Sequence, residues 1–525
     1  MKIIVQVIIL ISVLSLNIRA QEPVDKGLSM INQDALKAQL GFLASDWTEG
    51  RETGEKGAFM SADYIASMLR LFGAEPAGDI INAYDPSAGS MRQKQSYFQS
   101  FTLLKSSAGD KQHLALKRKE NGTIRTISFE YMSDFRLTPV YPGGTTEAGV
   151  VFVGYGYIDD ENNYNDFKGK NVKGKFILRL SGLPGDEEPS GDAYSAYRLQ
   201  REKDRIASEL GVAGIIEVDP YDDGLHWAEA RDFMNMSPSE SGRYRARQRY
   251  TIPGDIISPS PVTVSVSKRV ANTILAGSGF KVGDFLEGKR IIQEEDNDTK
   301  IVLSTSVNSS IVAVRNVLGK IEGKNKDEVI IIGAHYDHTG MSDGYIYNGA
   351  DDNGSGTVGV MTLARAINAS GVIPEKTIIF ALWTGEEKGL LGSRYYAANP
   401  TVAIDNIKMN LNFDMISRYV SDDQPNKVTM TYTDSYPYFR EITEKNLASY
   451  NIALEPDYQD ANNAPGASDH RSFVEKGIPI MRFKPGHREE YHKPSDEVST
   501  IDWDIMEKII KISYLNIWDL ANNKW

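Results

Sequence analysis

Short apolar segments alternate with helical patterns in the second half of the chain. The apolar segments cover residues 329–332, 377–382, 409–413 and 478–481. Continuous apolar segments of this length are typical of strands that are buried on both faces. Helical spacing of apolar residues separates them, for example at 357–369, and a longer helical pattern closes the chain at 503–521. This alternation predicts an α/β domain with a mostly parallel mixed sheet sandwiched by helices.

The first half of the chain has a different pattern. From 33 to 101 the apolar residues recur at helical spacing, as at Leu36, Leu40 and Leu43, and predict helices. The cluster Tyr-Pro-Gly-Gly at 141–144 interrupts any regular element. Strands are predicted after it at 149–154, 175–180, 214–218 and 262–266, with a helix at 203–210.

These patterns predict three parts. Residues 1–20 form a leader, because Lys2 precedes an apolar run over 3–16 and small Ala20 follows it, the order of a secretory signal peptide. A larger α/β domain then comprises 21–140 and 291–525, and a small β-rich module, 141–290, is inserted into it. We expect export to the periplasm or the outside of the cell, and no membrane span in the mature chain.

Composition excludes some classes of function. The chain has 525 residues and a formal net charge of −13, which argues against a nucleic-acid partner because such a partner requires a basic surface. It has no cysteine, which excludes disulfides, thiolate metal sites and a cysteine nucleophile.

Imidazole and carboxylate groups follow the predicted strands. His335 and Asp337 come after the first strand, Glu386 and Glu387 after the second, Asp414 after the third, and His492 after the fourth. An acidic loop with Asp351 and Asp352 opens the helix that follows the first strand. The carboxyl ends of parallel strands meet at one edge of a sheet, where ligands bind. Mixed histidine and carboxylate ligands suit zinc, so the sequence predicts a catalytic zinc site there.

The residues at these strand ends resemble a known family, the co-catalytic di-zinc aminopeptidases of the bacterial leucyl aminopeptidase and aminopeptidase Y type. This family also contains glutamate carboxypeptidases, glutaminyl cyclases and the non-catalytic transferrin receptor. The matching motifs are Ala-His-Tyr-Asp at 334–337, the Gly-rich acidic loop 349–356, Trp-Thr-Gly-Glu-Glu at 383–387, Asn-Phe-Asp-Met at 412–415, Ser-Asp-His at 468–470 and Tyr-His at 491–492, with Glu-Gly-Arg at 49–51 near the N-terminus. In the module, 172–175 and 211–215 resemble a protease-associated domain.

The resemblance implies a set of metal ligands for two Zn²⁺ ions per chain. His335 and Asp414 would bind one ion, Glu387 and His492 the other, and Asp352 would bridge them. Asp352 rather than its neighbour takes this place because the family's bridging Asp lies three residues before a Ser-Gly pair. Asp337 would orient the His335 ring, and Asp496 would do the same for His492.

The resemblance also implies roles in catalysis. Glu386 would be the general base that takes a proton from the attacking water and passes it to the leaving amine. Tyr491 would bind substrate by a hydrogen bond to the tetrahedral oxyanion. Relatives resemble one another in using a cis peptide at the bridging ligand, which predicts a cis Asp352–Asn353 bond. Together these roles predict an aminopeptidase that acts on peptides.

Other functions of the same family remain open from the sequence. A carboxypeptidase or dipeptidase would need a basic pocket for the substrate carboxylate, and Arg418, Arg471, Arg482 and Arg488 are near the predicted site. A cyclase would rely on one metal, whereas this chain has both His335 and Asp414. A receptor-like binding protein would lack ligands, and none of the implied set is missing.

Overall fold

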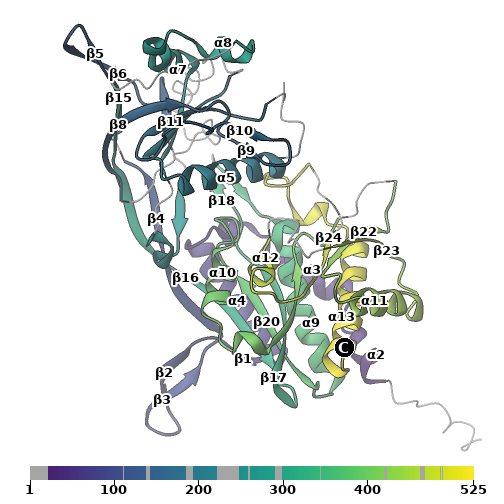
Figure 1. Ribbon diagram of the computed structural model, residues 1–525. Coiled ribbons are helices and arrows are strands. Elements are labelled where there is room, and N and C mark those ends of the chain that lie inside the picture. Colours follow the sequence, from purple (N-terminus) through teal and green to yellow (C-terminus); the bar gives the residue numbers. More distant parts are fainter. Residues whose placement is uncertain are drawn as a thin grey trace, which may run out of the picture. The chain divides into compact units, whose positions relative to one another are not determined.

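The computed structural model divides the chain into two compact units (Figure 1). Unit 1 comprises Met1–Phe101, Ala313–Met341 and Tyr345–Trp525, and unit 2 comprises Thr102–Val312 with Ser342–Gly344. The residues that the structure describes are 22–109, 111–137, 142–184, 193–220, 248–257, 261–289, 298–342, 344–418, 423–460, 468–484, 486 and 489–525. The predicted signal peptide lies outside them.

Unit 1 is built on a mixed sheet, in agreement with the predicted fold class. Its strands lie in the order β16-β20-β17-β21-β24-β22-β23. The central strands β20, β17, β21 and β24 are parallel, β16 and β22 are antiparallel to their neighbours β20 and β24, and β23 runs parallel to β22. The bounds are β16 Val307–Ile321, β17 Asn325–His335, β20 Lys376–Trp383, β21 Ile407–Phe413, β22 Lys427–Tyr432, β23 Glu455–Asp460 and β24 Ile480–Lys484.

Helices cover both faces of this sheet because the central strands are apolar on both sides. Ile330 and Ile332 of β17 belong to one core cluster, together with residues of α3, α4, α9 and α13. Val329 and Ile331 point the opposite way, into a second cluster with residues of α10 and α12. The helices of unit 1 are α2 Pro23–Leu28, α3 Gln33–Leu43, α4 Lys56–Leu71, α9 Gly356–Ser370, α10 Leu391–Ala398, α11 Tyr438–Ser449, α12 His470–Val474 and α13 Trp503–Asn522.

Short elements complete unit 1. The remaining strands are β1 Glu75–Pro76, β2 Ile80–Asp85, β3 Ser90–Gln95 and β19 Tyr345–Tyr347. The short helical turns are η1 Asp46–Arg51, η5 Ala350–Ser355, η6 Ile404–Asn406 and η7 Val498–Thr500. Strands β4 Phe98–Ala108, β16 and β18 Gly340–Ser342 include residues of both units.

One prediction for the N-terminal region was wrong. The helical pattern expected from 33 to 101 continues only to Leu71, where α4 ends, and strands β1 to β4 follow. In β4, Gln99, Phe101 and Leu103 are buried, whereas Ser100 and Thr102 are exposed. This period of two is the pattern of a strand with one buried face, and it overrides the helical pattern upstream.

Unit 2 contains an eight-stranded sheet with its own apolar core. Its strands lie in the order β6-β5-β15-β8-β11-β12-β14-β7, and β8, β11, β12 and β14 are parallel. The bounds are β5 His113–Glu120, β6 Thr123–Phe129, β7 Phe135–Leu137, β8 Gly144–Phe152, β11 Phe176–Leu180, β12 Gly214–Val218, β14 Thr263–Val266 and β15 Thr299–Thr305. The other elements are β9 Ile158–Asp159, β10 Tyr164–Asn165, β13 Arg249–Thr251, α5 Ala193–Glu209, α7 Lys268–Leu275, α8 Val282–Leu286, η3 Pro253–Ile257 and η4 Ala276–Ser278. Its identification as a protease-associated domain stays a prediction.

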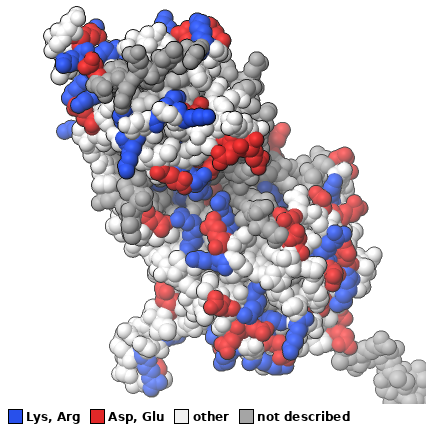
Figure 2. Space-filling view, in the orientation of Figure 1, with Lys and Arg blue, Asp and Glu red and all other residues white. Residues whose placement is uncertain are grey.

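Two surface properties concern possible partners. Among the described residues, no helix has both the length and the apolar character needed to cross a bilayer. On the face drawn in Figure 2, Lys and Arg side chains are intermingled with Asp and Glu side chains. The chain as a whole carries a net charge of −13.

Candidate metal centre

His335 is the last residue of β17 and is buried. Its Nδ1 lies 3.1 Å from the main-chain oxygen of Asp337. A carbonyl oxygen can only accept a hydrogen bond, so in the neutral ring Nδ1 carries the proton and Nε2 keeps its lone pair. This Nε2 lies 3.5 Å from Asp352 Oδ1 and 3.6 Å from Asp414 Oδ1. His335 therefore presents a metal-binding nitrogen to two carboxylates.

The strand register brings these residues together. In the parallel sheet His335 pairs with Trp383 of β20, and Ala334 pairs with Phe413 of β21. Asp414 therefore follows β21 beside the end of β17, and Glu386 and Glu387 follow β20 at the same edge. The site lies where ligands bind in open α/β sheets.

The carboxylate of Asp337 connects two of these strand ends, rather than holding the His335 ring. Its Oδ1 accepts a hydrogen bond from the main-chain N–H of Glu386 at 3.1 Å, and its Oδ2 accepts one from Thr53 Oγ1 at 2.8 Å. The distance from Asp337 Oδ1 to His335 Nδ1 is 3.9 Å. Asp337 thus orients His335 through its carbonyl and the glutamate loop through its side chain.

Asp352 faces two histidines with its two oxygens. Oδ1 lies 3.5 Å from His335 Nε2, and Oδ2 lies 3.1 Å from His492 Nε2. Asp352 belongs to the turn η5, immediately before α9, and its peptide bond to Asn353 is cis, as predicted. One carboxylate therefore lies between two imidazoles from different parts of the chain.

The neighbouring Asp351 points away from this site. Its Oδ1 accepts hydrogen bonds from the main-chain N–H and the hydroxyl of Ser417, at 3.0 and 2.6 Å. Asp496 accepts hydrogen bonds from the main-chain N–H groups of Asp351 and Asp352, each at 3.0 Å. Asp496 therefore fixes the backbone of the acidic loop, whereas the sequence predicted that it would orient His492.

The two adjacent glutamates lie on different sides of the site. Glu387 Oε1 lies 2.9 Å from His338 Nδ1, and its Oε2 lies 3.1 Å from His492 Nε2. Glu386 Oε2 instead lies 3.9 Å from His335 Nε2. The side chains thus form two groups, and within each group the possible ligand atoms lie within 4.8 Å of one another. One group is His338, Asp352, Glu387 and His492, and the other is His335, Glu386 and Asp414.

Tyr491 and His492 form the more exposed side of the site. Their rings stack with centroids 3.9 Å apart. Burial raises the pKa of Tyr491, and the carboxylates of Asp352, Glu387, Asp414 and Glu386 raise it further, so its hydroxyl stays protonated. The tyrosine can therefore donate a hydrogen bond beside the metal-binding residues.

The concentration of acids shifts the pKa values of the metal-free site. Burial raises the pKa of Glu386 well above its ordinary value, and the charges of Glu387, Asp469 and Asp414 add to this effect. Burial also raises the pKa of Glu387, but hydrogen bonds from His338 and His492 outweigh it and hold that pKa well below the ordinary value. Glu386 therefore tends to hold a proton, whereas Glu387 stays ionised.

Two residues without a predicted role support the site. Arg51 is buried and donates hydrogen bonds to four main-chain oxygens, those of Tyr336 at 2.8 Å, Leu43 at 2.7 Å, Asn348 at 2.6 Å and Gly349 at 2.8 Å. His338 is fully buried against Glu387. Its position three residues after His335 was the available sequence signal, because a second imidazole so close to a strand end reaches the same edge of the sheet.

Asp469, from the Ser-Asp-His motif at 468–470, is fully buried. Neither of its carboxylate oxygens has a hydrogen-bond partner within ordinary distance among the described residues. Burial raises its pKa to about 7, while His335 and the Ser393 hydroxyl act in the opposite direction. As at Glu386, burial is the main cause of the raised pKa.

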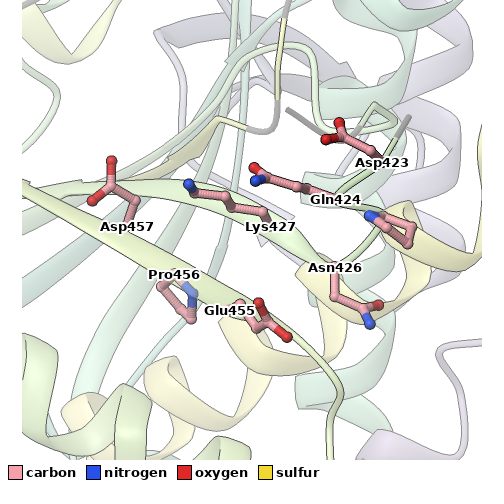
Figure 3. Close-up of a pocket in the computed structure, with 8 residues that line it drawn as sticks. Asp423, Gln424, Asn426, Lys427, Glu455, Pro456 and Asp457 are labelled. Atoms are coloured by element: carbon pink, nitrogen blue, oxygen red, sulfur yellow. The ribbon is translucent and has the colours of Figure 1, made fainter. Parts of the chain in front are cut away.

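A separate pocket lies at the beginning of β22 and β23 (Figure 3). It has a volume of about 470 Å³, and its charged lining residues are Asp423, Lys427, Glu455 and Asp457. None of the residues in the two metal-binding groups lines it. The candidate site is therefore the strand-end cluster and not this pocket.

Histidines and carboxylates at the strand ends of a helix-covered α/β sheet define a candidate metal-binding site of the α/β class. Residues 316–516 match the model of Peptidase family M28. This part of the chain therefore belongs to Peptidase family M28, and it contains every residue of both metal-binding groups.

Individual relatives agree with this assignment. The chain is 32% identical over 166 residues to leupeptin-inactivating enzyme 1 of Streptomyces exfoliatus, covering 31% of this chain and 34% of the relative. It is 30% identical over 170 residues to leucine aminopeptidase 2 of Arthroderma otae, covering 31% and 32%. The match thus spans about a third of the length of these relatives. The structure of an aminopeptidase from Aneurinibacillus sp. strain AM-1 superposes with a TM-score of 0.56 at 18% identity, covering 95% of this chain and 97% of that one, which shows a shared fold.

Proposed function

We propose that this protein is a zinc-dependent aminopeptidase that removes N-terminal residues from peptides. The observation that carries the proposal is the placement of Asp352, with one oxygen toward His335 and the other toward His492. A carboxylate between two imidazoles suits a pair of metal ions that share one ligand. The match to Peptidase family M28 and the similarity to leucine aminopeptidase 2 support the same activity.

The residues fit two zinc ions. His335 and Asp414 would hold one, Glu387 and His492 the other, and Asp352 would bridge them. Each ion would have imidazole nitrogen and carboxylate oxygen ligands, which zinc favours, and fewer than four protein ligands, as in catalytic sites. When bound, zinc supplies a Lewis acid and brings the pKa of a coordinated water near neutrality.

The other side chains of the site would move protons and stabilise charge. Glu386 lies beside the His335 group and is not a proposed ligand, so it is placed to take a proton from water and then give it to the leaving amine. Tyr491 would donate its hydroxyl hydrogen to the developing oxyanion. Asp337 would hold the Glu386 backbone in place for this work.

A carboxypeptidase or dipeptidase function is less well supported, because the described arginines near the site have other partners. Arg418 is buried, donates to Thr500 Oγ1 at 2.6 Å and lies 3.7 Å from Asp351. Arg471 pairs with Glu475 at 2.8 Å, and buried Arg482 lies 3.4 Å from His470 Nδ1. Arg488 lies outside the described residues. A receptor-like binding function would not require the complete set of ligands.

The proposal also includes export through the segment 1–20 and a role of the inserted module in substrate choice. The export proposal rests on Lys2, the apolar run after it and Ala20. The proposed role of the module rests on the fact that none of the proposed metal ligands lies within 141–290. We expect peptides, not nucleic acids, as substrates.

The test is hydrolysis of a peptide with a free N-terminus and of the same peptide N-acetylated, with products identified by mass spectrometry. An aminopeptidase releases the first residue of the free peptide and leaves the acetylated one intact. Metal analysis before and after dialysis against a chelator should find two zinc ions and then none, with activity lost and restored by zinc. Release of the C-terminal residue would contradict the proposal.

A further inference from the structure

His338 is held firmly beside the proposed ligand Glu387. It follows β17 by three residues, is fully buried, and its main-chain N–H donates to the carbonyl of Arg51 at 3.2 Å. The acidic loop packs on its ring, because a Cβ atom added to Gly349 would lie 2.5 Å from His338 Cδ2. The ring of His492 contacts it edge to face, with centroids 5.6 Å apart. Backbone and packing therefore fix where the imidazole lies.

The two oxygens of Glu387 have different histidine partners. Oε1 lies 2.9 Å from His338 Nδ1, whereas Oε2 lies 3.1 Å from His492 Nε2. An ionised carboxylate only accepts hydrogen bonds, so the proton between Glu387 and His338 belongs to Nδ1. A nitrogen that carries this proton has no lone pair for a metal. The distances distinguish His338 from His492, although both belong to one group of possible ligands. His338 Nδ1 is close to Glu387 alone, because it lies 3.8 Å from Asp352 Oδ2, whereas His492 Nε2 lies 3.1 Å from an oxygen of each carboxylate.

We propose that His338 is a positioning residue that holds Oε1 of Glu387 by an Nδ1–H hydrogen bond, so that Oε2 alone is presented to the metal. This inference rests on the proposed metal site. Residues that orient metal ligands typically contribute about 10–100-fold to metal affinity. The shared Asp352 Oδ2 lies farther from His338 Nδ1, at 3.8 Å, so the effect should concentrate on the ion bound by Glu387 and His492.

Three substitutions separate this role from a general packing role. His338→Asn places an amide nitrogen at the position of Nδ1, because both atoms are bonded to Cγ. His338→Gln places its amide nitrogen nearer the position of Nε2. His338→Leu fills the space without a donor. His113, exposed on β5 in unit 2, provides the matched control His113→Leu.

The experiment titrates zinc into each full-length apoprotein against a competing chelator, with circular dichroism to check folding and Co²⁺ absorption to report ligand geometry. We expect His338→Gln and His338→Leu to lose about 10–100-fold in affinity for one of the two ions. His338→Asn should retain most of the wild-type affinity and spectrum, and His113→Leu should match wild type. If His338→Leu does not fold, the Asn and Gln variants decide alone.

The outcomes distinguish this inference from the proposed function. Wild-type protein that binds no zinc overturns the proposed function, and the inference with it. If wild-type protein binds two ions and His338→Gln has the same zinc affinity as wild type, the inference is overturned but the proposed function is not. Equal loss of one ion in the Asn and Gln variants, with an altered Co²⁺ spectrum, would make His338 a direct ligand and also overturn it.

Discussion

At the residue scale, adjacent residues of the same chemical type have different surroundings. Asp352 faces two histidines, whereas Asp351 is bound by Ser417. Glu387 contacts His338 and His492, whereas Glu386 lies on the side of His335. Each pair sits in a turn beyond a strand or before a helix, where successive side chains point in different directions. Composition cannot distinguish such neighbours, so substitutions of the glutamates test the proposed roles directly.

Glu386→Gln removes the proposed base but keeps the size and shape of the side chain. We expect zinc content to persist, because Glu386 is not a proposed ligand, and kcat to fall by at least about 10²–10⁴-fold, the usual contribution of a general acid or base. Glu387→Gln should instead lower zinc occupancy at one site. Glu444→Gln, at an exposed position of α11, is the control. Zinc loss in the first variant and retention in the second would reverse the two roles.

Zinc binding should release protons and strengthen as the pH rises. Burial lowers the pKa of His492, but hydrogen bonds to Asp352 and Glu387 outweigh this effect and raise the pKa to about 10. The metal-free site therefore holds a proton on His492 at neutral pH, and zinc must displace it because only neutral imidazole binds metal. Calorimetric titration at pH 7 in buffers with different ionisation enthalpies measures the released protons. Heats that do not depend on the buffer would contradict the prediction.

The chemistry of the site was accessible from the sequence, but its supporting contacts were not. The sequence indicated strand-end residues such as His335 and Asp414, since a strand end is visible in the apolar pattern. The structure brings them together, while their roles remain proposals. The contacts of His338 and Asp496 depend on how loops fold back, which no local pattern specifies. Asp496 binds main-chain N–H groups 144 and 145 residues away in the chain.

At the scale of elements, the side chain of Arg51 connects the turn η1 to the metal-binding loops. Arg51 donates to the main chain on both sides of the metal-binding loops, at Tyr336 after β17 and at Asn348 and Gly349 before η5. Burial lowers its pKa to about 10, so the guanidinium remains charged at neutral pH. Periodicity predicted the four parallel central strands of unit 1 and helices such as α9 and α13, but not strands β1 to β4 or β22. A connection like that of Arg51, between residues hundreds of positions apart, was not predicted either.

Replacing Arg51 should destabilise the fold and loosen the site. Arg51→Met fills similar volume but removes the donor from the main-chain oxygens of Tyr336 and Asn348. The oxygens of Leu43 and Gly349 keep hydrogen bonds from Thr48 Oγ1 and the Gly354 N–H. Each unsatisfied buried group costs about 1–3 kcal/mol, so we expect the free energy of unfolding of unit 1 to fall by at least about 2 kcal/mol, with weaker zinc binding. Arg51→Lys keeps the charge but has fewer donors, so its free energy of unfolding should lie between those of wild type and Arg51→Met. Denaturant unfolding of the apoproteins measures this, and a stability equal to wild type in Arg51→Met would contradict it.

At the scale of the whole molecule, the metal site and the inserted β-rich part belong to different cores. The clusters around the central sheet of unit 1 contain only residues of that unit, and the main cluster of unit 2 runs from Leu114 to Leu303. All residues of both metal-binding groups lie in unit 1. Each unit thus has what a domain needs to unfold as its own cooperative transition.

Calorimetry should therefore resolve two unfolding transitions, and zinc should shift only one. A ligand that binds only the folded state stabilises it by about 2.7 kcal/mol at a free concentration one hundred times its dissociation constant. Unit 1 should gain this stability, and unit 2 should unfold at the same temperature with zinc or with a chelator. Scans of Glu387→Gln identify the zinc-dependent transition, because its shift should shrink while the other transition stays in place. A single transition, or an equal shift of both, would show that the two units unfold together and that zinc stabilises the chain as a whole.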